Sequence, residues 1–452
     1  MPTMAQAVAR LKGNFADILS ESVLLGICSE LGLRFRKRTL TPVVTAYLFL
    51  RQVLHGNIAV PAVQRLSKLD FTESAYCQAR ARLPVAFFRR LQRAVTGSLT
   101  ASDALTAEEL WHGHRLFLLD GSSFSMPDTP ELQETFGQPG MQTPGCGFPV
   151  AHLLCLFDAR RGYLLRGTAA PLRTHDLKQA AALHDELRPG DVLVGDRAFC
   201  SYAHLALCRR RKLHGLFRAH QKLIVDFRPH RRHLPPGTAA KGQTGLPRSR
   251  WLKRLGKGDQ LVEYFKPKER PTWMSAQEYE RLPASLVVRE VRVKITEPGR
   301  RTREVILVTT LLDVRRYSAR ALAKLYGQRW QVEVDLRHLK ATLGLDVLRC
   351  TTVPGVIKEL QMFIVAYNLV RRVMVQAARR QRVVPDRISF VDALRWLQQA
   401  APGEEVPKLR INRERPGRAE PRVRKRRPKQ YDLMRKPRAE LKKALKPKQR
   451  AA

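Results

Sequence analysis

The chain has 452 residues, and its 82 lysines and arginines against 40 aspartates and glutamates give a formal net charge of +42 at pH 7. Its apolar fraction of 44% is ordinary for a globular protein and excludes a mainly disordered chain. The length suggests about two to four folding units. So large a positive charge predicts a polyanionic partner, and nucleic acid is the first candidate because neutralised phosphates release counterions.

The sequence shows no sign of secretion or of a membrane anchor. The apolar stretch Val43–Leu50 is cut by Arg51, well short of the roughly 20 residues that a membrane span needs. No apolar core of a signal peptide is visible in residues 1–13. The seven cysteines include no Cys-x-x-Cys pair, which is typical of reduced thiols in a cytosolic protein. We therefore expect a cytoplasmic protein with no membrane partner.

The charge is distributed unevenly. Its balance is +6 over residues 1–110, −2 over 112–200, +10 over 226–304 and +13 over 404–452. An acidic segment inside a basic protein is consistent with metal ligands, because hard cations take carboxylate oxygens. A chance fluctuation of composition is the alternative.

The first 110 residues predict a helical domain. Residues 41–54 and 84–99 carry apolar side chains at three- and four-residue spacing. A short basic helix over residues 74–83, with Gln78, Arg80 and Arg82, is a candidate recognition helix for DNA. The alternative is a small helical bundle with a charged face.

From residue 112 the pattern changes to an alternation of strands and helices, which indicates an α/β layered fold. The expected strands are residues 114–120, 150–157, 162–169, 191–196 and 213–218, and the expected helices are residues 174–187 and 201–212.

The second half of the chain combines predicted strands, helices and a basic tail. Residues 226–304 are basic, and we expect a β-rich insertion there, with a strand over 286–296 followed by another over 304–312. Helices are expected over residues 318–343, 356–381 and 388–400. The tail, residues 404–452, is basic and poor in apolar residues, so we expect it to be disordered or to follow DNA.

Three acids stand out as candidates for chemistry. Asp120 and Asp196 each end a predicted strand, and ligand sites in open α/β sheets form outside the carboxyl ends of strands. Glu333 lies on the helix predicted over 318–343. At 100° per residue, Tyr326, Arg329, Glu333 and Lys340 fall within a 60° arc that borders the apolar stripe. The alternative is a solvated helix face stabilised by i, i+4 ion pairs.

The motifs that contain these residues resemble those of a known family. Tyr326, Arg329, Glu333 and Lys340 match the Tyr-x2-Arg-x3-Glu-x6-Lys signature of DDE transposases in the group of insertion sequence family four. Asp120-Gly-Ser and Gly-Asp196-Arg-Ala-Phe resemble the two other blocks of that family. The spacing is similar too, because 76 residues separate Asp120 from Asp196 and 137 separate Asp196 from Glu333.

The resemblance implies a fold and a division of the chain. The fold would be α/β, a ribonuclease-H-like catalytic core of mixed sheet and flanking helices, interrupted by a β-rich insertion and preceded by an all-α domain. The expected units are a helical DNA-binding domain (1–110), the first part of the core (111–225), the insertion (226–304), the second part of the core with C-terminal helices (305–403) and the basic tail (404–452).

The resemblance also implies a reaction. Asp120, Asp196 and Glu333 would hold two Mg²⁺ ions, with Mn²⁺ as a substitute, and these would stabilise the attacking and leaving oxygens of a phosphodiester. Water would free a 3′-hydroxyl that then attacks target DNA, with excision through a hairpin intermediate. Arg329 and Lys340 would hold end phosphates and Tyr326 would position the terminal strand.

The expected partners are double-stranded DNA, both transposon ends and target, and a second copy of the chain. The protein would be bacterial and nucleoid-associated when bound to DNA. Trp251 or Trp273 could stack on a flipped base, although a place in the core of the insertion is equally consistent. Two alternatives stay open, a nuclease of the same fold and a DNA-binding protein of transposase descent without catalysis.

Overall fold

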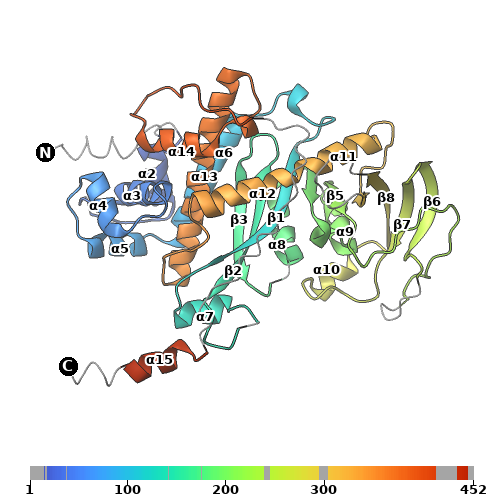
Figure 1. The fold of residues 1–452 in the computed structure, drawn as a ribbon, viewed down its shortest axis with the longest axis horizontal. Coiled ribbons are helices and arrows are strands. Elements are labelled where there is room, and N and C mark those ends of the chain that lie inside the picture. Colours follow the sequence, from blue (N-terminus) through green and yellow to red (C-terminus); the bar gives the residue numbers. More distant parts are fainter. Residues whose placement is uncertain are drawn as a thin grey trace.

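The computed structural model describes residues 15, 18–36, 38–140, 142–174, 176–238, 245–294, 304–413 and 435–445. Within these residues, nine strands form one mixed sheet in the order β3-β2-β1-β4-β5-β9-β8-β7-β6 (Figure 1). Helices lie on both faces of its first half, so the architecture is mixed α/β as the strand and helix pattern predicted.

The first five strands form the half of the sheet that carries the candidate acids. β1 pairs antiparallel with β2, which pairs antiparallel with β3, whereas β4 and β5 run parallel to β1. These strands are β1 (Leu116–Ser125), β2 (Val150–Asp158), β3 (Leu164–Pro171), β4 (Val192–Gly195) and β5 (His214–Arg218). All five were predicted, but β1 runs five residues beyond Asp120, so this residue lies inside its strand and not at the end.

The other four strands extend the same sheet. β9 pairs antiparallel with β5, and β8, β7 and β6 follow as an antiparallel run to the far edge. Their bounds are β6 (Ser249–Gly256), β7 (Asp259–Phe265), β8 (Ser285–Lys294) and β9 (Glu304–Thr309). Residues 249–294 thus contain strands, as the sequence predicted, although residues 295 and 296 of one predicted strand lie outside the described residues.

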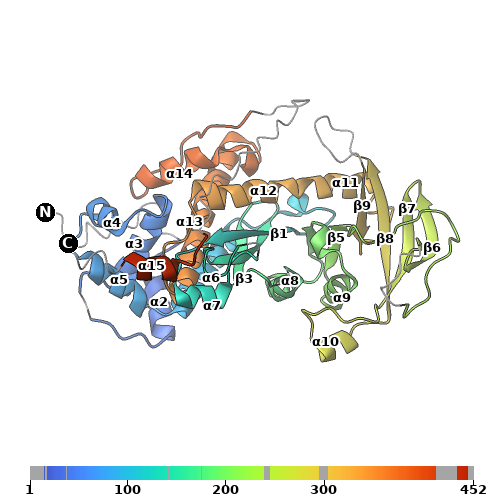
Figure 2. The same ribbon diagram turned by 60° about the horizontal axis from the view of Figure 1, so that its bottom comes forward.

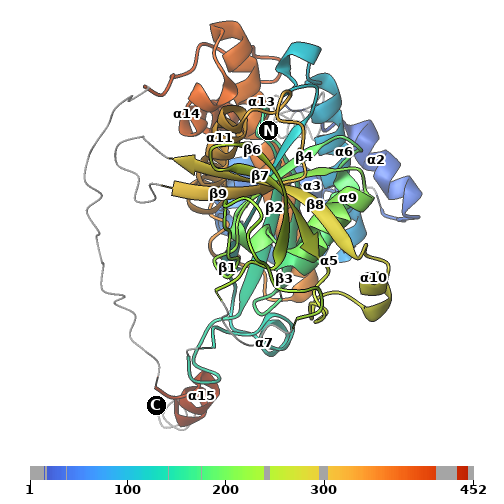
Figure 3. The same ribbon diagram turned by 90° about the vertical axis from the view of Figure 1, so that its right-hand side faces the viewer.

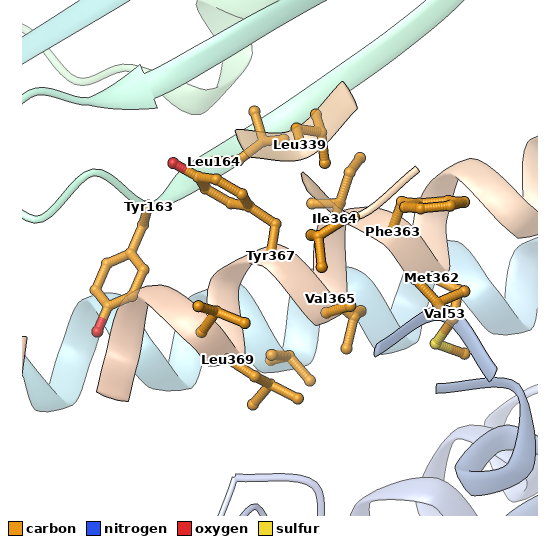
Figure 4. Packing of buried hydrophobic residues seen from close by; sticks show 14 of the residues in the cluster. Val53, Tyr163, Leu164, Leu339, Met362, Phe363, Ile364, Val365, Tyr367 and Leu369 are labelled. Atoms are coloured by element: carbon orange, nitrogen blue, oxygen red, sulfur yellow. The ribbon is translucent and has the colours of Figure 1, made fainter. Parts of the chain in front are cut away.

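Buried apolar side chains in the described residues form two cores, one on each face of the sheet. The larger core contains α13 (Val353–Gln381), which is buried along nearly its whole length. Figure 4 shows Val53, Leu164 and Leu339 around it, from a helix near the N-terminus, from β3 and from the segment after α12. Length and composition alone would let α13 cross a membrane, but 78% of its most apolar window is buried, which is typical of a core helix.

The smaller core lies under α8 (Asp176–Leu183) and α9 (Tyr202–Arg210). In Figure 2, α11 (Ala319–Gln328) and α12 (Trp330–Arg337) run along one face of the sheet, and α8 and α9 lie on the other. The predicted helix 318–343 is thus divided. It is interrupted at Arg329, which lies between α11 and α12 with helical backbone angles, and it ends in a π-helical segment, His338–Thr342.

The first hundred residues are helical where they are described, and their helices pack against α13 in the larger core. The α-helices are α2 (Glu21–Glu30), α3 (Pro42–Leu54), α4 (Val60–Ser67), α5 (Glu73–Arg82) and α6 (Val85–Ser102). The candidate recognition helix is α5, and one of its basic residues makes contacts within the protein. The Arg80 guanidinium lies 3.7 Å from the centre of the Phe49 ring and donates hydrogen bonds to Gln52 and Cys350.

The described part of the tail is ordered, contrary to the prediction of disorder there. Val406 and Leu409 are buried in the larger core, and residues 438–445 form a helix, α15 (Arg438–Leu445). Arg438 pairs with Asp128 beside α7 (Pro130–Phe136), and Figure 3 shows α15 below that helix. Residues 414–434 lie outside the described part of the chain. The remaining helices are α10 (Ala276–Glu280) and α14 (Phe390–Gln399).

Candidate active site

The sheet brings Asp120 and Asp196 together through the register of two parallel strands. Leu118 of β1 is opposite Val194 of β4, so two residues further on Asp120 faces Asp196. Leu118 and Val194 both point into the larger core. Because side chains alternate along a strand, the two aspartates point to that same face, on strands about 4.8 Å apart.

Local hydrogen bonds hold each aspartate in place. Asp120 accepts a hydrogen bond of 2.8 Å from the backbone N–H of Gly121. Asp196 follows β4 directly and caps a short 3-10 turn, Arg197–Phe199, where it accepts a 2.8 Å bond from the N–H of Ala198. The two carboxylates are thus fixed by the backbone on which they lie.

Glu333 reaches the same place from α12, which packs across β1. Arg329 connects the two elements. Its Nη2 donates to Glu333 Oε1 at 2.8 Å, and its Nη1 lies 3.5 Å from Asp120 Oδ2. The expected i, i+4 pair is therefore present, but Arg329 also contacts an acid of the sheet, which a purely solvated helix face would not provide.

The electrostatics of the site favour a cation. The pKa of Asp120 is raised to about 6, chiefly by burial and also by the charges of Asp196 and Glu333, against the opposing effects of the Gly121 N–H and Arg329. Only 18% of the Asp120 side chain is exposed. Negative charge is therefore costly at this position unless a cation offsets it.

Two further residues, Tyr326 and Arg218, complete the surroundings of the three acids. Arg218 was not among the predicted site residues. Burial raises the pKa of the Tyr326 hydroxyl, and the charges of Arg329, Arg218 and Asp196 act on it as well. Arg218 ends β5, and the β4–β5 register places it beside Asp196. The sequence carried this signal, because one predicted strand ends in Asp196 and the next in Arg218, but it depends on the pairing of the two strands.

Lys340 lies further along, in the π-helical segment. Its ammonium pairs with Asp346 at 3.0 Å, and the backbone carbonyl of Asp346 accepts a hydrogen bond from the N–H of Ser125 at the end of β1. The structure therefore brings Tyr326, Arg329 and the three acids together, and leaves Lys340 beside the distal end of β1.

Other candidates lie away from the acids. Asp335 points to the opposite side of α12 and is buried against Arg371. In the sheet extension, the Trp251 ring centre is 4.4 Å from that of His230. Trp273 is partly buried against the smaller core.

The donor set of the site fits divalent metal ions. Asp120, Asp196 and Glu333 supply only carboxylate oxygens, the ligands that Mg²⁺ and Mn²⁺ prefer. Fold and donor set together are typical of a class of protein, the α/β enzymes that act on phosphodiesters through metal-binding carboxylates.

The comparison with known families gives a more specific answer. The family model described as the transposase DDE domain matches residues 111–369, more than half of the chain, and the chain belongs to this family.

Relatives agree with this assignment. The transposase InsG for insertion sequence element IS4 of Escherichia coli (strain K12) is 24% identical over 92% of this chain and 93% of its own length. The putative transposase InsZ of the same strain is 31% identical over 28% of this chain and 42% of its own length. A cryo-EM structure of the piggyBac transposase synaptic complex with hairpin DNA has a TM-score of 0.41 at 12% identity, covering 85% of this chain and 78% of that one. At that level the likeness says nothing about residues.

The protein is therefore a DNA transposase of the IS4 group, and its reactions are phosphodiester cleavage and DNA strand transfer. DNA is its partner, and the family generally uses divalent metal ions.

Proposed function

We propose that this transposase cuts the ends of its insertion sequence and joins them to target DNA at one site formed by Asp120, Asp196 and Glu333. Two Mg²⁺ ions, replaceable by Mn²⁺, would be held by these three carboxylates. The observation that carries the proposal is the parallel register that puts Asp120 beside Asp196, with Arg329 linking Asp120 to Glu333.

Bound there, the ions would supply charge stabilisation at the attacking and leaving oxygens of the phosphodiester. The protein's own residues orient the DNA around that point. Arg329 is a bidentate donor for an end phosphate, Lys340 a point charge further along the strand, and Tyr326 a surface for the terminal nucleotide. Arg218, beside Asp196, is a further candidate for a phosphate contact.

The strand order supports a finer assignment of the fold. A meander β1-β2-β3 followed by parallel β4 and β5, in the order 3-2-1-4-5, is consistent with a ribonuclease-H-like core. In this proposal residues 111–225 and 305–403 form that core, 226–304 are the insertion, 1–110 are a helical DNA-binding domain and 404–452 are a basic tail. Two copies would bring two DNA ends together.

The test is a strand-transfer assay. Full-length protein is incubated with Mg²⁺, labelled DNA carrying the element's own ends and a target plasmid. We expect cleaved ends, a hairpin intermediate and label joined to the plasmid. A nuclease of the same fold would cut without joining, and a non-catalytic DNA-binding protein would do neither.

Asp196→Asn tests the site within that assay, because the amide keeps the size of the side chain and removes its charge. We expect loss of nearly all cleavage with end binding retained. Glu134→Gln on α7 is the matched control, since Glu134 is exposed and away from the acids. Full activity in Asp196→Asn would overturn the assignment.

A further inference from the structure

A second cluster of metal-ligating side chains lies in the smaller core, on the face of the sheet opposite the three acids. It consists of His184, His204 and Cys208, all fully buried. His204 and Cys208 are one turn apart on α9, and His184 comes from the 3-10 turn after α8. One ligand atom of each lies within 4.8 Å of the other two.

A hydrogen bond orients the His204 imidazole as in many metal sites. His204 Nδ1 is 2.8 Å from the carbonyl oxygen of Phe199, which can only accept, so Nδ1 carries the proton. The lone pair of His204 Nε2 then points to His184 Nε2, 3.0 Å away. A ligating histidine commonly donates its other N–H to a backbone carbonyl, which fixes its tautomer and ring orientation.

The alternative is a pair of histidines packed in a core. In that pair His184 Nε2 would donate to His204 Nε2, leaving a lone pair on His184 Nδ1. This atom is buried and has no hydrogen-bond partner among the described residues. The atom lacks a partner in either arrangement. What a packed histidine pair does not explain is the Cys208 sulfur, which lies within 4.8 Å of a ring nitrogen of each histidine.

We propose that His184, His204 and Cys208 bind one Zn²⁺ ion. Two imidazole nitrogens and one thiolate suit this borderline-soft ion, which takes three protein ligands with a water in the fourth position. Binding exchanges the thiol proton of Cys208 for the ion. The all-carboxylate site on the other face suits hard cations instead, so the two sites select different metals.

The Zn²⁺ site has a structural consequence for catalysis. His204 holds the carbonyl of Phe199, and Phe199 ends the 3-10 turn that begins at Asp196. An ion that fixes His204 would therefore stiffen the turn that carries Asp196, from behind the sheet. The site itself does not depend on the proposed roles of the acids.

The test is metal analysis of full-length protein that has been expressed with zinc and dialysed against Mg²⁺ buffer. We expect about one Zn²⁺ per chain, retained in Asp196→Asn and lost in Cys208→Ser. Cys28→Ser, another buried thiol, and Cys77→Ser, an exposed one, are controls that should retain the ion. Retention in Asp196→Asn separates this result from any failure of the acid site.

Cobalt provides a readout that does not depend on a variant folding. Wild-type protein titrated with Co²⁺ after zinc removal should develop thiolate-to-cobalt charge-transfer absorption, unchanged in Cys28→Ser and Cys77→Ser. Folded wild-type protein with neither co-purified zinc nor this band would overturn the proposal, and so would a band that disappears in Cys77→Ser.

Discussion

At the scale of single residues, the site holds its negative charge at a cost. Asp120 is largely buried beside Asp196 and Glu333, and its pKa of about 6 stands above the ordinary value of 3.8. A carboxyl group whose pKa is raised by folding binds more protons in the folded state. Its contribution to stability is therefore present at low pH and lost as the pH rises through about 6.

Asp120→Asn should remove this penalty. In the absence of divalent ions we expect the variant to be more stable than wild type at pH 8 by up to about 3 kcal/mol, since one pKa unit corresponds to about 1.4 kcal/mol. The difference should shrink toward zero below pH 4. Denaturant unfolding across this pH range measures it, with Glu134→Gln as a control that shows no such trend. A pH-independent difference would contradict the account.

Arg329 offsets part of the same charge by contacting both Asp120 and Glu333. It therefore competes with metal ions while DNA is absent. Arg329→Gln should bind Mn²⁺ about tenfold more tightly without DNA, a change of about 1.4 kcal/mol, and should cleave DNA ends poorly.

Calorimetric titration with Mn²⁺ measures the first effect. Arg337→Gln is the matched control, because Arg337 lies on α12 but is exposed. Unchanged or weaker Mn²⁺ binding by Arg329→Gln would show that the arginine does not compete with the ions.

At the scale of elements, the position of α12 depends on a buried ion-pair network. Arg371 of α13 lies 3.6 Å from Asp335 of α12 and 2.8 Å from Asp386, and donates to the backbone carbonyl of Arg161. Asp335 is two residues beyond Glu333, so this network holds the helix that delivers the third acid.

Arg371→Met should leave Asp335 buried without its partner and lower the free energy of unfolding by about 3–5 kcal/mol. Arg395→Met on the exposed face of α14 is the control and should change little. Denaturant unfolding of both variants measures the difference in their free energies of unfolding. A loss below about 1 kcal/mol for Arg371→Met would mean that the network does not hold α12.

The same elements show what the sequence could predict. Apolar spacing identified the strands of the first half of the sheet and the buried stripe of α11 and α12, because hydrophobic periodicity reports which face is covered. It did not predict the break at Arg329 or the π-helical end, because these depend on packing against β1 and α13. It also placed Asp120 at a strand end, since periodicity does not say where pairing with β2 stops.

The sequence also did not show which distant segments lie side by side in the fold. The local pattern made Arg80 a candidate DNA contact, and only the folded structure shows that it also packs against Phe49 and Cys350. Arg218 was overlooked because only the β4–β5 register shows that it lies beside Asp196. The three acids themselves were predicted from their motifs, and the strand register explains why two of them meet.

At the scale of the whole molecule, charge predicts how the protein responds to salt. Its net charge is +42, and residues 404–452 alone hold a balance of +13. The logarithm of the affinity for DNA should fall linearly with the logarithm of salt concentration, with a slope set by the number of phosphates neutralised.

Replacing the lysines and arginines of residues 414–434 by glutamine keeps the length of the tail and removes eight of its 19 positively charged side chains. If the tail follows DNA, the slope should become shallower by about 3 units, measured by fluorescence anisotropy on duplex DNA between low and physiological salt. Identical slopes would show that the tail does not neutralise phosphates.

The most direct test of the central claim is anomalous X-ray diffraction from crystals of the protein with its end DNA and Mn²⁺. The account predicts two Mn²⁺ peaks about 3.5–4 Å apart, enclosed by the carboxylates of Asp120, Asp196 and Glu333. Peaks that leave any of these three acids without a metal contact, or no peak between β1, β4 and α12, would contradict it.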